Sequence, residues 1–431
     1  MKNELLSTVL VFCATLTAQE APLKLSGTLQ TDDRVLTKSD APLDWQEYRL
    51  SLKAEAKAGG SSRFFSETWV RALGTPAIRD DPSLSLREAY FDVYGFLNNR
   101  LDIRIGRQRI AWGTGDKVNP TDNLNADDLE DIYDFGRHLG SDGVKLTGYA
   151  GPWTLTGVFL PAFRKAQRPV SSIQEMLMPM PVGLPVVDDV PGATIKDGAS
   201  AGLRLSSNIL NTDMSLSYYY GRDDLPVGQA SIHMGFTGLD TTLYLRYPRI
   251  QVIGADFAGQ LATIGIRGEF GLFLPEAVRH RIDVDPAFAA IAFSSVPLPD
   301  PGAALKDDPY VKWALGLDYT LPIDVYLNVQ WVHGLPFERG EELEDYLLAN
   351  ADWTVLNGKL KVSPLGIGLE MKDFDDLSEH YAVFGQPQIT GYPVDNTELG
   401  VGARIIEGKT GTHFGALKEL DEVFVKARYS F

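Results

Sequence analysis

This sequence has almost no cysteine, no apolar run long enough to span a membrane after its first residues, and no surplus of basic residues. Its 431 residues include one cysteine, Cys13. After position 21 no apolar run reaches the ~18 residues that a spanning helix needs, and the most apolar windows, 181–187 and 287–298, are short and contain proline. The 40 Lys and Arg residues are outnumbered by 57 Asp and Glu, a net charge of −17. This charge argues against nucleic acid as a partner, because phosphate backbones are bound by surplus Lys and Arg.

Residues 1–21 have the layout of a secretory signal peptide. Lys2 precedes the apolar run LLSTVLVFCATL, and Ala18 and Ala21 are candidate cleavage points. An ordinary buried N-terminal helix is the alternative. With the segment removed, residues 22–431 contain no cysteine, which excludes disulfides, a cysteine nucleophile and a zinc–thiolate site.

Short runs of alternating apolar and polar residues recur along the chain, for example at 48–55, 311–318, 325–331 and 423–431. A period of two is typical of strands with one apolar face. The connections alternate in length as well. Short turns at 58–62, 96–99, 150–153 and 320–323 alternate with long segments at 32–44, 113–141, 161–197, 222–247, 273–308 and 333–350.

This pattern predicts an all-β fold, a transmembrane antiparallel up-and-down barrel of 16–18 strands with short periplasmic turns and long extracellular loops. We favour 18 strands, because both termini then lie on the short-turn side. A Lys or Arg facing lipid costs about 2 to 4 kcal/mol, so the charged strand faces must turn to the lumen. A soluble sandwich is the alternative, but aromatic residues near the strand ends are typical of an interfacial girdle. These residues are Trp69, Trp112, Trp153, Tyr218, Tyr319 and Trp331.

The stretch 100–134, RLDIRIGRQRIAWGTGDKVNPTDNLNADDLEDIYD, organises the predicted site. It begins as a strand whose alternation changes phase at Gly106, which predicts a β-bulge there. With that bulge, Arg104, Arg107 and Arg109 share one face. Asn125 is a plausible N-cap for a short acidic helix over 126–133.

Two motifs resemble a known family. The segment GRQRIAWGTGDKVNPTDNLNADDL at 106–129 and the last strand, which ends in RYSF, resemble a family of porin-like proteobacterial outer-membrane proteins of unknown function. That family is similar in layout to the alginate-export and phosphate-selective porins. The resemblance implies a barrel in the cell outer membrane, whose terminal strand ending in Phe431 is recognised by the outer-membrane assembly machinery. It implies no single cargo.

The basic residues of the early strands are the candidate pore-lining residues. Opposed charges in a pore create a transverse field that sets ion preference. The alternative is that these side chains pair with one another and only make the wall rigid. The predicted basic ladder consists of Arg104, Arg107, Arg109, Arg49, Lys53 and Arg71, and it faces the carboxylates Glu88, Asp92 and Asp116.

Evidence for bound metal or catalysis is weak. Asn123, Asn125 and Asp127 offer oxygen ligands of the kind calcium takes, but their spacing departs from an EF-hand, and a solvated helix start is the alternative. The six histidines are scattered, without an HExxH pair. A hydrolase needs a His beside a nucleophile and an acid. We therefore expect no cofactor and no enzymatic activity.

The sequence thus predicts a passive channel for small hydrophilic or acidic solutes. The loops 113–141 and 161–197 narrow the lumen. The apolar stretch 170–190 folds inward or rests on the rim, and the loop 275–309 is similar to it in character. A non-conducting barrel that serves as a surface binding or export-assembly module is the alternative. The expected partners are outer-membrane lipid and lipopolysaccharide, the assembly machinery and a small solute in the lumen.

Overall fold

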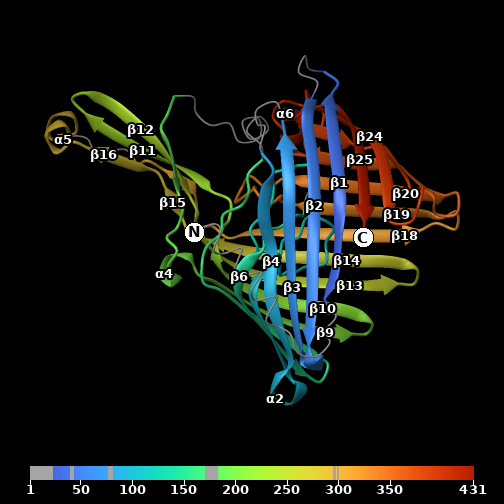
Figure 1. The fold of residues 1–431 in the computed structure, drawn as a ribbon. Coiled ribbons are helices and arrows are strands. Elements are labelled where there is room, and N and C mark those ends of the chain that lie inside the picture. The colour runs from blue at the N-terminus through green and yellow to red at the C-terminus, as the bar shows by residue number, and fades with distance from the viewer. Residues whose placement is uncertain are drawn as a thin grey trace.

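The computed structural model describes residues 23–38, 43–75, 81–134, 136–169, 183–294, 298 and 300–431. The predicted signal peptide therefore lies outside the described residues, and so do residues 170–182 of the loop 161–197. Figure 1 shows one large β-wall and a smaller sheet that projects away from it. None of the helices in the described part of the chain is long and apolar enough to cross a bilayer.

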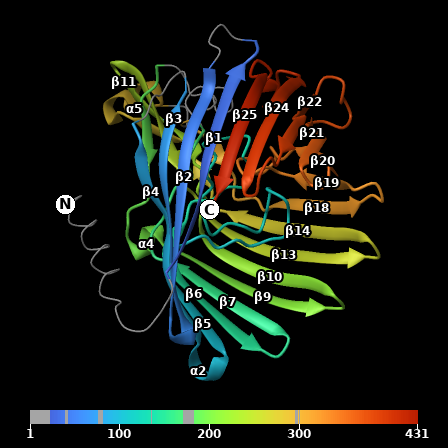
Figure 2. The same ribbon diagram turned by 45° about the vertical axis from the view of Figure 1, so that its right-hand side comes forward.

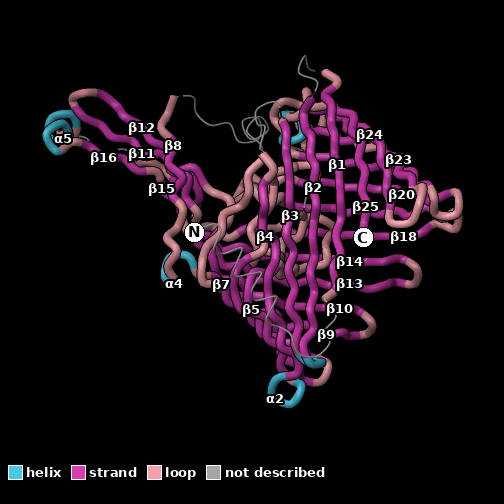
Figure 3. Tube along the Cα trace, in the orientation of Figure 1, coloured by secondary structure: helices cyan, strands magenta, loops and turns pink. Residues whose placement is uncertain are grey.

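The large wall is built from side-by-side strands, which Figure 3 draws in magenta. Neighbouring strands in it pair antiparallel. They are β1 (Lys24–Leu36), β2 (Leu43–Ala58), β3 (Ser62–Gly74), β4 (Ser83–Gly95), β5 (Leu101–Gln108), β6 (Ser141–Ala150), β7 (Trp153–Leu160), β9 (Ser200–Ile209), β10 (Thr212–Arg222), β13 (Arg249–Leu261), β14 (Ile264–Pro275), β18 (Tyr310–Thr320), β19 (Val325–His333), β20 (Asp345–Val355), β21 (Leu360–Met371), β22 (Tyr381–Gly385), β23 (Gln388–Gly391), β24 (Thr397–Gly408) and β25 (Glu422–Ser430).

The wall closes into a barrel because β1 pairs with both β2 and β25. The described residues form 19 strand segments in this sheet. Two of them, β22 and β23, both pair with β21 on one side and β24 on the other, so they share one position. Nineteen segments with one shared position give 18 strands, which confirms the favoured strand count. Figure 2 shows the strands from β6 to β25 continuing the wall around from β5.

Short turns and long connections lie at opposite ends of the strands. The β9–β10 turn is one of the short ones, and its Leu210 and Asn211 have φ values of 54° and 61°. Two residues at positive φ suit the right-handed twist of a hairpin. The chain leaves β25 at the short-turn end, where Gly27 and Phe431 exchange backbone hydrogen bonds of 2.9 and 3.0 Å.

Polar and apolar side chains separate across the wall. Leu216, Phe270 and Leu315 point outward and are 63%, 48% and 50% exposed. Asp256 and Glu269 face each other in the register on the opposite side and are buried. An apolar outer face around a charged interior suits hydrocarbon, so the protein is an outer-membrane barrel, as predicted.

The predicted aromatic girdle is partly wrong. Trp153, Tyr218 and Trp331 are exposed on the outer face, but Trp69 and Trp112 are only 9% and 4% exposed. Trp69 pairs with Ser51 on the charged inner face, and Trp112 follows β5 in a segment that enters the barrel. Proximity to a strand end does not reveal the face on which a residue lies.

The described residues of 109–140, between β5 and β6, fold into the barrel, and we call them the inward segment. Its Trp112 packs with Val158 of β7 and Val252 of β13. Its Ile132 packs with Trp45 of β2 on the opposite wall. The segment therefore crosses the lumen, as predicted for the loop 113–141.

Two local predictions for this stretch are wrong. The register of β5 runs without a shift against both β4 and β6, so Gly106 forms no bulge. Gly106 has φ +126°, and a Cβ there would lie 2.3 Å from the carbonyl oxygen of Ala89, so close contact with β4 explains the glycine. Residues 126–133 form no helix. Asp127 instead bridges to His138 and Asp128 to Gln167, because these chain segments pair with one another inside the barrel.

The later long loops build the projecting sheet, which lies at the upper left in Figure 1. Four strands form it and two shorter ones adjoin it, so the described part of 275–309 extends away from the barrel rather than into it. The sheet strands are β8 (Val186–Asp189), β11 (Val227–Gly235), β12 (Gly238–Arg246) and β16 (Arg281–Val284), and β15 (Val278–Arg279) pairs with β17 (Ala303–Leu305). The short helical elements are η1 (Gly59–Ser61), α2 (Phe96–Asn99), α4 (Ile195–Gly198), α5 (Pro286–Ala292) and α6 (His413–Ala416).

Candidate functional site: the lumen and its inward segment

Arginines lie over aromatic rings on the inner face of the early strands. The guanidinium carbon of Arg49 is 4.4 Å from the ring centre of Trp69, and that of Arg87 is 4.1 Å from the same ring. The guanidinium carbon of Arg104 is 3.9 Å from the ring centre of Tyr90. Aromatic faces attract cations, so these rings hold the guanidinium groups close to the wall.

Two arginines of the predicted ladder face their predicted carboxylates. Arg104 Nε donates to Asp92 at 2.6 Å. The side chain of Arg109 donates to Glu67 and Glu88 at 2.8 Å each, and it remains 37% exposed. The opposed charges are therefore realised as ion pairs between neighbouring strands, and Arg109 keeps access to the lumen. Their role as pore-lining residues stays a prediction.

Arg107 lies on the other face. The register places it opposite Ala89 and Asp142, with the parity of Ile105, which is 54% exposed on the outside. Its guanidinium pairs with Asp142 at 2.8 Å. Without a bulge at Gly106, positions 104 and 107 of β5 lie on opposite faces of the sheet. Arg107 therefore does not belong to the predicted basic ladder.

Among the remaining basic residues, Arg71 connects the wall with the inward segment. Arg71 contacts Glu47 of β2 at 2.6 Å and donates to Glu130 of the inward segment at 2.5 Å. Lys53 lies opposite Glu67 in the register of β2 and β3, on the inner face. The ladder residues thus hold the inward segment as well as the wall.

The tip of the inward segment binds one carboxylate of the far wall. Glu269 of β14 accepts hydrogen bonds from the N–H groups of Thr114 and Gly115 and from the hydroxyl of Thr121 at 2.9 Å. Gly113 has φ +93°, and a Cβ there would lie 2.5 Å from an oxygen of Glu269. Only glycine permits this approach.

A half-buried histidine lies between two acids of the inward segment. His138 Nδ1 is 3.2 Å from Asp127, and its Nε2 is 3.5 Å from Asp122. Burial works to lower the pKa of His138, but the hydrogen bond to Asp127 and the charge of Asp122 outweigh it and raise the pKa to about 9. Burial raises the pKa of Asp122 to about 7. The imidazolium therefore holds this part of the segment together at neutral pH.

The calcium candidates Asn123, Asn125 and Asp127 line one small cavity, and hydrogen bonds within the protein use the amides of both asparagines. Asn125 Oδ1 accepts the N–H of Ile110, and its Nδ2 donates to Ser141 at 2.9 Å, so its amide links the two ends of the inward segment. Asn123 Nδ2 donates to the carbonyl of Pro120. Among the described residues, the side chains of Asn123 and Asn125 therefore make contacts that hold the inward segment together.

A cavity of about 430 Å³ lies between the inward segment and the wall from β19 to β24. Its polar lining includes Asp116, Asn328, Gln330, Asn350, Asp352 and Gln386. Asp116 is 52% exposed and contacts Arg267 at 3.2 Å and Asn328 at 3.0 Å. The cavity leaves space for a small solute beside the inward segment.

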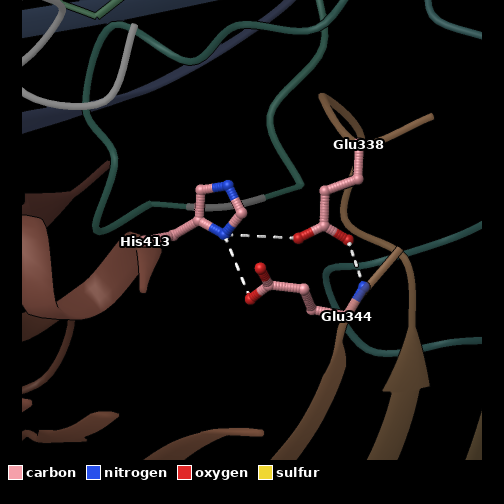
Figure 4. Close-up of side chains that lie close together, drawn as sticks. All are labelled: Glu338, Glu344 and His413. Atoms are coloured by element: carbon pink, nitrogen blue, oxygen red, sulfur yellow. Dashed lines mark hydrogen bonds and ion pairs between the residues drawn. The ribbon is translucent and has the colours of Figure 1, made fainter. Parts of the chain in front are cut away.

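The same cavity leads to a cluster that sequence reasoning missed. Figure 4 shows His413 of α6 facing Glu338 and Glu344 from the connection between β19 and β20. Its Nδ1 lies 3.5 Å from each of these carboxylates and 3.3 Å from Glu370 of β21. The members span positions 338 to 413, and no local spacing joins them.

Comparisons with known proteins give structural similarity alone. No family model matches the chain, and no curated protein resembles it in sequence. A loop-deletion mutant of OmpT from Vibrio cholerae is 9% identical with a TM-score of 0.44, over 96% of this chain and all of that one. OmpF of Salmonella typhi, in complex with daunomycin, is 11% identical with a TM-score of 0.43, over 95% of this chain and 98% of that one. The barrel assignment rests on the strand registers rather than on these likenesses.

The sequence predicted that the protein has no enzymatic activity, and this prediction was wrong. One barrel architecture hosts unrelated functions, so neither the fold nor the scattered histidines exclude catalysis.

Proposed function

We propose that the protein is a porin-like channel for small hydrophilic or acidic solutes, whose path runs through the cavity beside the inward segment. The observation that carries this proposal is that cavity of about 430 Å³, inside a closed barrel whose inner face is charged. A barrel of 18 strands is too wide for its own side chains to fill. The inward segment then acts as the constriction.

The charge pattern of the lumen supports a preference for acidic solutes. Arg109 is the ladder guanidinium that combines a place on the inner face with 37% exposure. Across the lumen, Asp116 is 52% exposed. A cation beside β3 and β4 and an anion on the inward segment create a field that orients dipolar solutes and filters ions by sign. Reversal potentials of the purified protein in planar bilayers under a salt gradient test this proposal.

A non-conducting surface module is the second candidate. The observation that favours it is the projecting sheet, in which Phe236, Leu239 and Ile291 are 65%, 68% and 71% exposed. Exposed apolar residues away from lipid suit a protein partner. A folded barrel that gives no current in bilayers supports this alternative.

The two ends of the barrel suggest two different partners, the outer-membrane assembly machinery and lipopolysaccharide. The assembly machinery would bind β25, which ends in Phe431 and pairs with β1 to close the barrel. Lipopolysaccharide would contact the acidic long-loop end through bridging divalent ions. Asp375 and Asp376 are exposed in the connection between β21 and β22, at that end.

A further inference from the structure

We propose that Glu338, Glu344, Glu370 and His413 form a binding site for a divalent first-row transition metal ion, with Zn²⁺ the best match to the donor set. One imidazole nitrogen and carboxylate oxygens suit such ions, whereas Ca²⁺ and Mg²⁺ prefer oxygen ligands alone. The site lies at the long-loop end of the barrel, where the β19–β20 and β24–β25 connections meet β21.

Three carboxylates approach the same atom, Nδ1 of His413. Nδ1 of His413 lies 3.5, 3.5 and 3.3 Å from oxygens of Glu338, Glu344 and Glu370. The hydroxyl of Tyr346 is also 3.1 Å away. A single N–H donates one good hydrogen bond, so a proton on Nδ1 cannot serve all these oxygens.

The separations fit a coordination sphere. Tetrahedral ligands at about 2.0–2.2 Å from an ion lie roughly 3.3–3.6 Å from one another. The three distances from Nδ1 fall within this range. Ligand atoms of Glu338, Glu344 and His413 all lie within 4.8 Å of one another.

One carboxylate oxygen is buried and aimed into the cluster. Glu344 is 6% exposed, and its Oε2, the atom that faces His413, has no hydrogen-bond partner. Its other oxygen contacts Lys372 Nζ at 3.2 Å. Burying a charged oxygen without a hydrogen bond is costly, and a bound cation would satisfy it.

The charge balance points the same way. Three carboxylates with at most 6% exposure face one imidazole, and Lys372, which is 42% exposed, is the nearby cation. With all three carboxylates ionised, their negative charges outnumber the positive charges of a protonated His413 and Lys372. A divalent ion offsets this excess directly.

The surroundings orient the ligands. Glu338 Oε2 accepts the N–H of Leu335 at 2.9 Å, and Glu370 Oε2 accepts the N–H of Phe414 at 2.7 Å. The ring of His413 packs edge-on against Phe337, with ring centres 4.9 Å apart. Such outer contacts fix metal ligands in place. His413 also lines the cavity of about 430 Å³, which gives an ion a route to the site.

Zn²⁺ titration of the chelator-stripped, detergent-folded full chain tests this proposal. We expect one equivalent of Zn²⁺ per chain by calorimetry and elemental analysis, and affinity at least tenfold weaker in H413Q and in E344Q. H380Q is the matched control, because the side chain of His380 is half-buried and its ring bonds only to the Asp376 carbonyl among the described contacts. Co²⁺ should give the absorption bands of a four-coordinate N/O site in the wild type.

Heat-modifiable migration on gels verifies that each variant is a folded barrel. E344Q keeps the size of the side chain, so it serves if H413Q fails to fold. Absence of stoichiometric Zn²⁺ in the wild type, or equal affinity in the folded E344Q variant, would overturn the site. The titration measures no current, so its outcome is independent of whether the barrel conducts.

Discussion

Arg34 of β1 and Asp131 of the inward segment form a buried, two-pronged ion pair. Arg34 Nη1 and Nη2 donate to the two oxygens of Asp131 at 2.9 and 2.5 Å. Arg34 is 1% exposed and Asp131 6%. Burial works to raise the pKa of Asp131, but Arg34 outweighs it and holds that pKa well below its usual range. This pair ties the constriction to the wall.

Removing one partner of this pair should destabilise the protein. R34Q leaves Asp131 buried without its cation, and breaking a buried pair in this way costs about 3–5 kcal/mol. We expect this loss in the free energy of unfolding, measured by denaturant titration in detergent micelles. R34Q/D131N, which removes both charges, should recover part of it. An R34Q variant as stable as the wild type would show that the pair does not hold the segment.

Stability should fall as pH rises through the titration of His138. Its pKa is raised to about 9, above the ordinary value near 6.5. The stability that comes from its charge is fully present below pH 6.5 and is lost as pH rises through 9. Thermal unfolding followed by circular dichroism should show this decline between pH 7 and 9.5. H138Q should flatten it, and an identical decline in H138Q would assign it to other groups.

Ion selectivity should depend on Arg109 and not on Arg107. R109Q removes an exposed cation from the inner face, so the reversal potential should shift toward cation preference. R107Q removes a charge of the same kind from the outer face and is the matched control. Equal shifts in the two variants, or none in R109Q, would reject the ladder as the filter.

Gly113 should be required to dock the tip of the inward segment. In G113A, the added methyl would meet Glu269, so the tip loses its carboxylate contact. Single-channel recordings should then show flicker or a changed conductance. G302A is the control, because Gly302 also has positive φ, at +74°, but no atom lies within 4 Å of its Cβ position. Steady, unchanged currents in G113A would contradict the docking role.

The barrel followed from the sequence because alternation and connection length are local signals. The run at 48–55 lies within β2 as expected, and the run at 423–431 lies within β25 except for its last residue. The direction of Arg107 did not follow, because it depends on whether Gly106 forms a bulge, and glycine also serves close strand contacts. Residues 126–133 resembled a helix start, but their acids are held by distant arginines such as Arg34 and Arg87.

The clusters built from distant residues were out of reach. His413 meets Glu338, Glu344 and Glu370 only because β19 to β25 bring their connections together at one end of the barrel. Nothing near His413 in the sequence distinguishes it from the other five histidines. The alternation of apolar and polar side chains was enough to predict the two faces of the wall. The contacts inside the lumen could be identified only once the pairing register of the strands was known.

Single-channel conductance in planar bilayers tests the central claim most directly. The wild type is compared with a variant in which residues 114–137 are replaced by a short Gly/Ser linker, and both are first verified as folded barrels by heat-modifiable migration. A channel narrowed by the inward segment should give small, steady steps in the wild type and steps several-fold larger in the variant. A folded wild type that never conducts, or equal conductance in both proteins, would contradict the account.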